Sequence, residues 1–85
     1  MQKITPQYLE SEIVHEHYWH VPGTMLTVCV LVGKNSVEAL GESSCADPAL
    51  FSEEIGKQRA RAKAFDKLWE YYGVILKAEK AKEHS

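Results

Sequence analysis

A run of nine uncharged residues near the middle of the chain constrains the fold more than any other feature. It extends from Thr24 to Val32, is rich in β-branched residues, and contains neither Gly nor Pro. The run is too short to span a bilayer and has the composition of a buried strand. Its apolar side chains fall on both parities. We therefore expect both faces of this central strand to be covered, by the chain itself or by another subunit.

The length of the chain limits how this strand can be covered. With 85 residues we expect one domain, residues 1–85, and a core of marginal size. So short a chain offers few elements that could cover both faces, and this predicts a homo-oligomer. Ten Lys and Arg residues against twelve Asp and Glu residues argue against a surface for duplex nucleic acid. No apolar run suits a signal peptide or a membrane span, and the use of two cysteines fits a reducing compartment.

The order of patterns along the chain predicts an α+β fold, in which a small antiparallel meander packs against one long helix. Thr5 and Pro6 are typical of a helix start and predict a short N-terminal helix to about Ser11. Polar residues in the first strand place it at an edge of the sheet. Two turns, at Pro22-Gly23 and at residues 33–36, are expected to join three strands over residues 13–21, 24–32 and 37–43.

The long helix is expected to begin at Asp47-Pro48. Gly56 costs about 1 kcal/mol relative to Ala and indicates a kink or a close neighbour. Gly73 is a candidate C-cap, after which residues 74–76 resume the helix or form an extended arm, and residues 77–85 form a solvated helix end or a frayed tail. The predicted sheet-facing stripe combines spacings of four and three and comprises Phe51, Ile55, Gln58, Ala62, Phe65, Trp69 and Tyr72.

Two cations one helical turn apart are the first candidates for a binding site. Lys57 and Arg61 lie four residues apart on the long helix and flank the apolar stripe. An Arg with a Lys one turn away can clamp a phosphate or diphosphate. The alternative is a solvated helix face on which these cations pair with Glu54 or Asp66. The residues alone leave both interpretations open.

The polar loop between the third strand and the long helix is the second candidate. Its backbone N–H groups and hydroxyls, close to a helix start, suit an anion or a ribose, and capping and turn formation alone are the alternative. Cys45 in this loop would be the nucleophile of a hydrolase only with an ordered base, and no such partner is recognisable, so we expect no catalytic residues. The loop residues we expect to contact a ligand are Glu42, Ser43, Ser44 and Asp47.

Histidines and aromatic residues admit two interpretations each. His15 and His17 share a strand face and could ligate a metal ion, but no further ligand completes the set. We therefore expect a His-rich edge strand and no metal or cofactor. Trp19 and the aromatic residues of the long helix suit a core or an interface, with base stacking as the alternative.

Three separated blocks of this sequence resemble a known family. They are Pro22-Gly23-Thr24 with Leu26-Thr27-Val28-Cys29, residues 41–48 (GESSCADP), and residues 54–69, with Glu54, Ile55, Gly56, Ala60, Arg61, Ala64, Lys67, Leu68 and Trp69. The family consists of small tailed-phage accessory proteins and includes the first Thoeris anti-defence protein. The resemblance implies a phage anti-defence sponge in the host cytoplasm. Such a sponge binds cyclic ADP-ribose isomers, and in some members cyclic oligonucleotides at a separate site, without cleaving them. It also implies hexamers built from dimers.

The resemblance also implies roles for individual residues. The family pattern has a cation at Lys57 and an Arg at Arg61, in contact with ligand phosphates. After Asn35 the pattern continues with Gly and an aromatic residue, where this chain has Ser36 and Val37. Stacking on the adenine then falls to Trp19 or to a residue of a partner subunit. The competing function is a phage accessory protein that contacts another protein through an apolar surface and has no nucleotide ligand.

Overall fold

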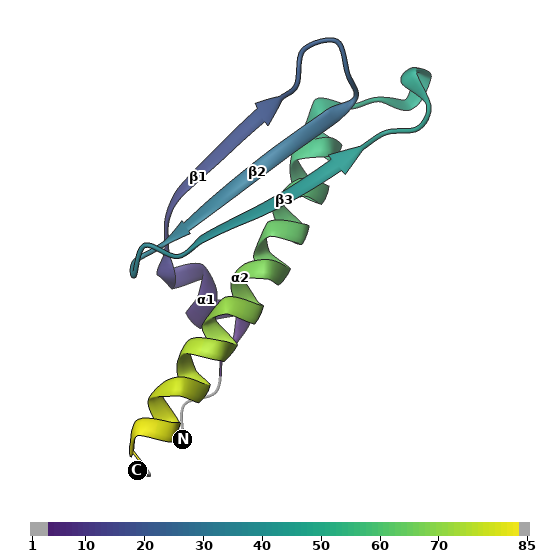
Figure 1. Cartoon of the computed structure of the whole chain (residues 1–85). Helices are drawn as coiled ribbons and strands as arrows, with labels where there is room; N and C mark the ends of the chain where they lie inside the picture. The colour runs from purple at the N-terminus through teal and green to yellow at the C-terminus, as the bar shows by residue number, and fades with distance from the viewer. Residues whose placement is uncertain (1–3, 84–85) are drawn as a thin grey trace.

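The computed structural model describes residues 4–83, which form a three-stranded antiparallel sheet with one long helix across one face (Figure 1). The strands lie in the order β1-β2-β3, so the apolar strand is central and β1 is an edge strand. This confirms the predicted α+β fold. The elements are α1 (Pro6–Glu12), β1 (Ile13–His20), β2 (Leu26–Gly33), β3 (Glu38–Ser44), the 3₁₀ helix η1 (Pro48–Leu50) and α2 (Glu53–Glu83).

The short helix and both turns form where the sequence predicts them. The Thr5 hydroxyl accepts a hydrogen bond from the Tyr8 amide at 3.1 Å, with proline in the first turn of α1. The turn after β1 contains Pro22 followed by Gly23, whose φ of +75° is that of a type II turn. In the turn after β2, Ser36 has a φ of +66°. Ser36 therefore holds a left-handed conformation at the position where the resembled family pattern has glycine.

The start of the long helix differs from the prediction. Asp47 and Pro48 begin only the short helix η1, in which the Asp47 carboxylate accepts a hydrogen bond from the Ala49 amide at 3.0 Å. Phe51 then returns to an extended conformation. Ser52 caps α2, because its backbone oxygen accepts from the Gly56 amide at 2.9 Å and its hydroxyl from the Ile55 amide at 3.4 Å. The N-cap and proline pattern at Asp47-Pro48 therefore starts only a single 3₁₀ turn, and the long helix begins five residues after Pro48.

The end of the long helix also differs. Gly73 is not a C-cap, since α2 continues to Glu83 and residues 74–76 stay helical. Nothing lies within 4 Å of the position where a Cβ of Gly73 would stand, and the helix continues through this glycine at a local cost of about 1 kcal/mol relative to Ala. α2 continues over residues 77–83, and residues 77–82 are exposed except for the half-buried Lys80, as expected for a solvated helix end, while the prediction for residues 84–85 lies outside the described residues. Within the described chain, no helix is both long and apolar enough to cross a bilayer.

The predicted sheet-facing stripe of α2 was correct for Tyr72, which is buried, and in part for Phe65, which packs partly buried against the core, and was wrong for the rest of α2. Ile55 and Trp69 are 47% and 36% exposed, and the buried residues of α2 are Ala60, Ala64, Leu68 and Tyr72. The physical reason lies in Gly41 of β3. A Cβ at Gly41 would stand 2.1 Å from the Ala60 carbonyl oxygen and 2.2 Å from the Ala64 nitrogen. The helix backbone therefore lies directly on the sheet, and only small side chains fit between them.

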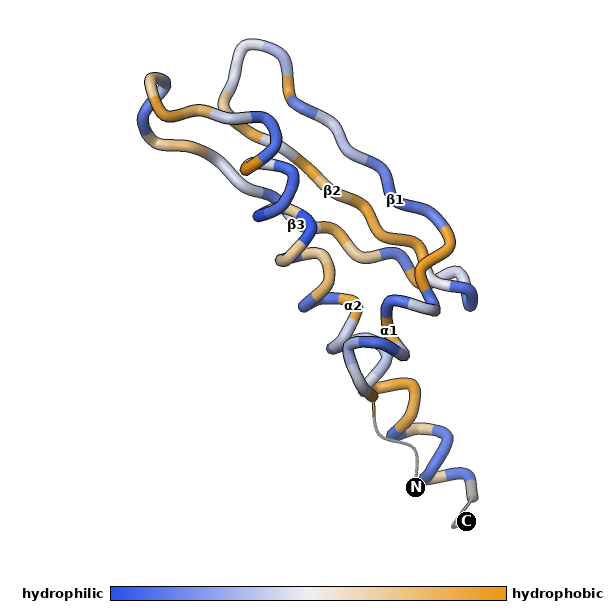
Figure 2. Tube along the Cα trace, turned by 180° about the vertical axis from the view of Figure 1, so that it is seen from behind, coloured by the Kyte–Doolittle hydropathy of each residue, from blue (hydrophilic) through white to orange (hydrophobic). Residues whose placement is uncertain are grey.

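The other face of the sheet has no covering layer in residues 4–83. Along β2 and β3, buried side chains that face α2 alternate with side chains on the open face that are partly or fully exposed. The apolar residues of the open face include Val28, Val30, Val32 and Leu40. Figure 2 shows the apolar β2 between more polar neighbours. The radius of gyration is 15.5 Å, against about 12 Å for a compact chain of this length. The described chain thus covers one face of the central strand, and the covering of the other face by another subunit stays a prediction.

Candidate functional site

Concave surfaces lie on both sides of the first turns of α2, a groove with an adjoining hollow on one side and a pocket on the other. The β1 groove lies on the side of β1, has a volume of about 490 Å³, and continues into a hollow of about 210 Å³. The β3 pocket lies on the other side, at the end of β3, with a volume of about 350 Å³. The groove and its hollow are lined by Tyr18, Trp19, His20, Thr27, Glu53, Glu54, Lys57, Gln58 and Arg61. The pocket is lined by Met25, Ser43, Cys45, Leu50, Phe51, Ser52, Ile55, Gly56 and Arg59.

Lys57 is the cation of the β1 groove that is available to a ligand. Its ammonium nitrogen lies 5.8 Å from the centroid of the Tyr18 ring, and none of the ion pairs among the described residues involves it. Burial, followed by the hydrogen bond to Glu16, raises the pKa of Tyr18 to about 12, so this hydroxyl stays protonated at neutral pH. The groove thus presents a positive charge above an aromatic face, which suits an anion with an adjacent ring.

Arg61 has a different environment. Its guanidinium donates to both carboxylate oxygens of Glu10, at 2.8 and 2.9 Å, and to both of Glu16, at 3.0 and 3.2 Å. These bonds raise the pKa of Arg61, with Glu16 as the larger cause, and the bond from Arg61 lowers the pKa of Glu16. The solvated-face alternative named Glu54 and Asp66 as partners, whereas the actual partners come from α1 and β1. Arg61 ties these two elements to α2.

This double ion pair limits what Arg61 can offer an anion. A guanidinium has five N–H donors, and the two carboxylates occupy four of them. A phosphate would reach Arg61 through the remaining donor or by displacing a carboxylate. Glu53 and Glu54 also line the groove, so an anion there meets acidic side chains as well as Lys57.

The hollow beside Lys57 contains an unusual polar group. Thr27 is 2% exposed, and its hydroxyl oxygen is the one buried side-chain oxygen or nitrogen in residues 4–83 without a hydrogen-bond partner. It lies on β2 directly beneath α2, where a Cβ on Gly56 would stand 2.8 Å from it. Leaving a buried hydroxyl unpaired costs about 1–3 kcal/mol. A ligand that reached into this hollow could remove that penalty by pairing with the hydroxyl.

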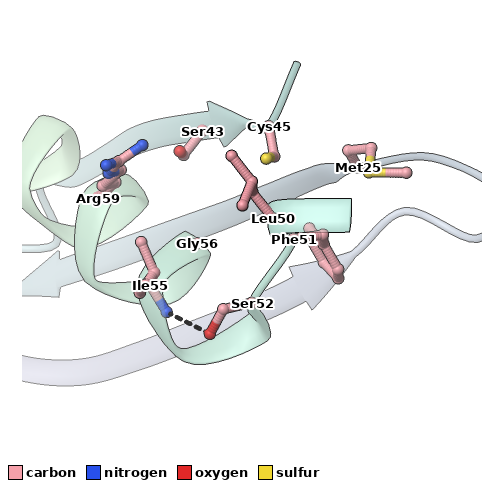
Figure 3. A pocket seen from close by; sticks show the side chains of 9 residues that line it. All are labelled: Met25, Ser43, Cys45, Leu50, Phe51, Ser52, Ile55, Gly56 and Arg59. Atoms are coloured by element: carbon pink, nitrogen blue, oxygen red, sulfur yellow. Dashed lines mark hydrogen bonds between the residues drawn. The ribbon is translucent and has the colours of Figure 1, made fainter. Parts of the chain in front are cut away.

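The β3 pocket combines an apolar end with a polar end (Figure 3). Met25 and Phe51 lie at one end, and the Arg59 side chain and Ser43 hydroxyl lie at the other. Two of its polar groups are already used, since Cys45 Sγ donates to the Asp47 carbonyl oxygen at 3.1 Å and the Ser52 hydroxyl caps α2. This arrangement suits a small ligand with an apolar body and a polar head.

The structure separates the other predicted site residues. Glu42 and Ser44 are exposed on β3 and alternate with Ser43, which points toward α2. Asp47 caps η1. Asn35 lies at the opposite end of the sheet, where its side-chain oxygen is 3.3 Å from the Tyr72 hydroxyl. Of the eight predicted residues, the β1 groove therefore brings together Lys57, Arg61 and Trp19, and the β3 pocket contains Ser43.

The histidine and cysteine alternatives gain no support from this geometry. The His15 and His17 rings lie 6.1 Å apart, yet no group of three or more His, Cys, Asp or Glu side chains in the described residues could hold a metal ion. Cys45 has its hydrogen bond to a backbone carbonyl rather than to a base. A thiol without a base nearby is a poor nucleophile at neutral pH.

Comparison with known families decides the relationship of this chain. Residues 4–80 match the phage protein (N4 Gp49/phage Sf6 gene 66) family. The chain belongs to this family. The match covers the whole sheet and most of α2, so both hollows lie within the family region. No curated protein and no solved structure matches the chain.

Several residues around the hollows were not predicted from the sequence. Tyr18 and Thr27 were assigned only to strands, and Glu10 and Glu16 were not recognised as partners of Arg61. The sequence contains a signal for one of these residues, because Thr27 is a polar residue within the apolar run Leu26 to Val32. The carboxylate partners lie 45 and 51 residues from Arg61 in sequence, and no local pattern reports such a contact.

Proposed function

We propose that this phage protein is an anti-defence sponge that binds a cyclic ADP-ribose signal, or a related cyclic nucleotide, in the host cytoplasm and withholds it without cleavage. The observation that carries the proposal is Lys57 in the β1 groove, which lies beside the Tyr18 ring and has no carboxylate partner among residues 4–83. The resemblance assigns ligand phosphates to this position. Tight binding needs little else than charge, a stacking surface and hydrogen bonds, and nanomolar affinity corresponds to about 12 kcal/mol.

The phosphates contact Lys57 first in this proposal, and Arg61 joins when a phosphate oxygen replaces a carboxylate. That exchange keeps the guanidinium paired throughout. The unpaired Thr27 hydroxyl offers a hydrogen bond to a ribose or base that enters the hollow. The Tyr18 ring beside Lys57 supplies the stacking surface in the groove. Trp19 borders the hollow, but it pairs with Val28, so its side chain belongs to the open face of the sheet.

Calorimetric titration with glycocyclic ADP-ribose isomers tests the proposal, followed by heating the complex and recovering the ligand. Binding with intact ligand released is expected. Lys57→Ala should weaken binding about tenfold or more, and Lys63→Ala, which removes an exposed cation of the same helix outside the groove, is the matched control. Glu16→Gln should strengthen binding, because a neutral amide competes less well for Arg61. No heat from these isomers, nor from cyclic di- and trinucleotides, would refute the sponge.

Thr27→Val provides a second, independent test. Valine has the shape of threonine without the hydroxyl, so the change should stabilise the free protein by about 1 kcal/mol. The same change should weaken ligand binding if the hydroxyl pairs with the ligand. A stabilised variant that binds as well as the wild type would exclude Thr27 from the site.

The proposal includes a homo-oligomer built from dimers, in which the open sheet face covers its counterpart on a second copy. Two three-stranded faces of this length bury on the order of 1,000 Å² together, near the lower bound for a specific interface. The register supports a face-to-face pairing that aligns β1 of one copy with β3 of the other. His15 and Glu38 both pair with Val32, and Trp19 and Glu42 both pair with Val28. That alignment brings His15 of one copy to Glu38 of the other, and Trp19 of one copy to Glu42 of the other.

Light scattering after size-exclusion chromatography tests this interface. Val30→Glu places a charge in the central row and should give monomers, while Val74→Glu, on the exposed part of α2, should leave the assembly unchanged. If the wild type is monomeric, the open face is free for another protein. That result would favour the competing function, a phage accessory protein acting through protein–protein contact, because an apolar face of this kind marks an interaction site.

A further inference from the structure

A second binding site lies on the other side of α2, separate from the groove of Lys57. We propose that the β3 pocket binds a small aromatic monoanion, with its ring among Met25, Leu50 and Phe51 and its carboxylate or sulfonate on Arg59 and Ser43 (Figure 3). The pocket is a hollow of about 350 Å³, at the lower end of the range for small-molecule sites. Its volume is sufficient for a bicyclic ring with a charged head group.

The polar end of the pocket has two groups that the protein itself does not use. Ser43 has 9% of its surface exposed and lines the pocket, so its hydroxyl is not fully buried as that of Thr27 is, and it forms none of the hydrogen bonds found among the described residues. Arg59 belongs to none of the ion pairs in residues 4–83. Figure 3 shows the Arg59 side chain and the Ser43 hydroxyl at the same end of the hollow. A cation and a hydroxyl so placed suit the oxygens of one anionic head group.

The apolar end determines the rest of the ligand. Phe51 stacks on His20 at a centroid distance of 5.0 Å, which fixes its ring as a wall of the pocket. Leu50 is 73% exposed at the entrance and Ile55 is 47% exposed, so both would bury apolar surface on a bound ring. A single cation lines the pocket. These features favour one negative charge and an apolar body over a diphosphate, which needs two or three cations.

Titration with 2-naphthoate, followed by amide chemical shifts, tests the site. The largest shifts are expected at Ser43, Cys45 and Ile55. Arg59→Ala should weaken binding about tenfold. Lys63→Ala removes an exposed cation one turn further along α2 and should leave the affinity unchanged. Ser43→Ala should weaken binding by a smaller factor, and the neutral analogue 2-naphthylmethanol should bind about tenfold less tightly than 2-naphthoate.

Three results would overturn the proposal. One is the absence of shifts at about 2 mM 2-naphthoate, a concentration that detects even millimolar affinity. Another is equal affinity of Arg59→Ala and the wild type. The third is a set of shifts centred on Val28, Val30 and Val32, which would place the probe on the open sheet face.

Discussion

Gly41 provides the most direct test of how α2 lies on the sheet. A methyl group at this position would stand 2.1 Å from the Ala60 carbonyl oxygen and 2.9 Å from the Ala64 Cα. Ordinary contacts of a Cβ are about 3.4 Å or longer, so the helix would have to move by about 1 Å along much of its contact with β2 and β3. The atoms in the way belong to helix backbone and cannot rotate aside. The sheet backbone on the other side is held by its hydrogen bonds to β2.

We therefore expect Gly41→Ala to destabilise the protein by about 3 kcal/mol or more, at the upper end of the range for overpacked cores. A chain of this length has a total stability of about 4–13 kcal/mol. The variant should thus lose a large part of its stability. Guanidinium unfolding followed by far-UV circular dichroism measures this loss, with the protomer concentration held constant because assembly adds to the apparent stability.

Gly73→Ala is the matched control, because it makes the same change in a helix where nothing lies within 4 Å of the added methyl group. There the higher helix propensity of alanine should stabilise α2 by up to about 1 kcal/mol. Opposite signs for the two variants are expected. A Gly41→Ala protein within about 0.5 kcal/mol of the wild type would refute the close approach of helix and sheet.

Further predictions concern the ion pair, a buried tyrosine and a strained turn. Arg61→Ala should destabilise the protein by about 1 kcal/mol, because the carboxylates that it pairs with are partly exposed. In the wild type, the pair contributes stability at neutral pH that is lost as the pH falls through the lowered pKa of Glu16, and the variant should lack this pH-dependent part. Identical acid unfolding of both proteins would contradict this. Burial, followed by Glu12, raises the pKa of Tyr72 to about 12, so stability present below pH 10 should be lost as the pH rises from 10 to 12, and Tyr72→Phe should flatten that loss. Ser36→Gly should stabilise the protein by about 1 kcal/mol, because Ser36 has a positive φ; an unchanged melting temperature would contradict this.

Local signals in the sequence predicted most of the fold. The N-cap and proline at Thr5-Pro6, the type II turn at Pro22-Gly23 and the apolar run of β2 each depend on neighbouring residues, and each formed as expected. The same kind of signal at Asp47-Pro48 was correct as a cap but not as the start of α2. Caps report where a turn begins, whereas the length of the helix that follows depends on contacts beyond it.

Helical spacing correctly predicted that two of the candidate site residues lie together, and their role in binding stays a prediction. Four-residue spacing placed Lys57 and Arg61 side by side on α2, and both line the β1 groove. The spacing could not show that Arg61 is engaged by Glu10 and Glu16, which come from α1 and β1. Asn35 was grouped with the site from its place in a family pattern, yet the hairpin carries it to the far end of the sheet.

The sequence by itself determined which segments are helix, strand and turn, because propensity, capping and alternation act between residues close in the chain. The tertiary structure decided which face of α2 is buried. The sequence offered a stripe of large aromatic residues, but Gly41 lets the helix backbone rest on the sheet, and only Gly56, Ala60 and Ala64 fit in that space. Of the large side chains in that stripe, Tyr72 and partly Phe65 reach the core, while Ile55 and Trp69 are exposed. Steric fit between two distant segments, rather than hydrophobicity along one of them, fixed the orientation of the helix.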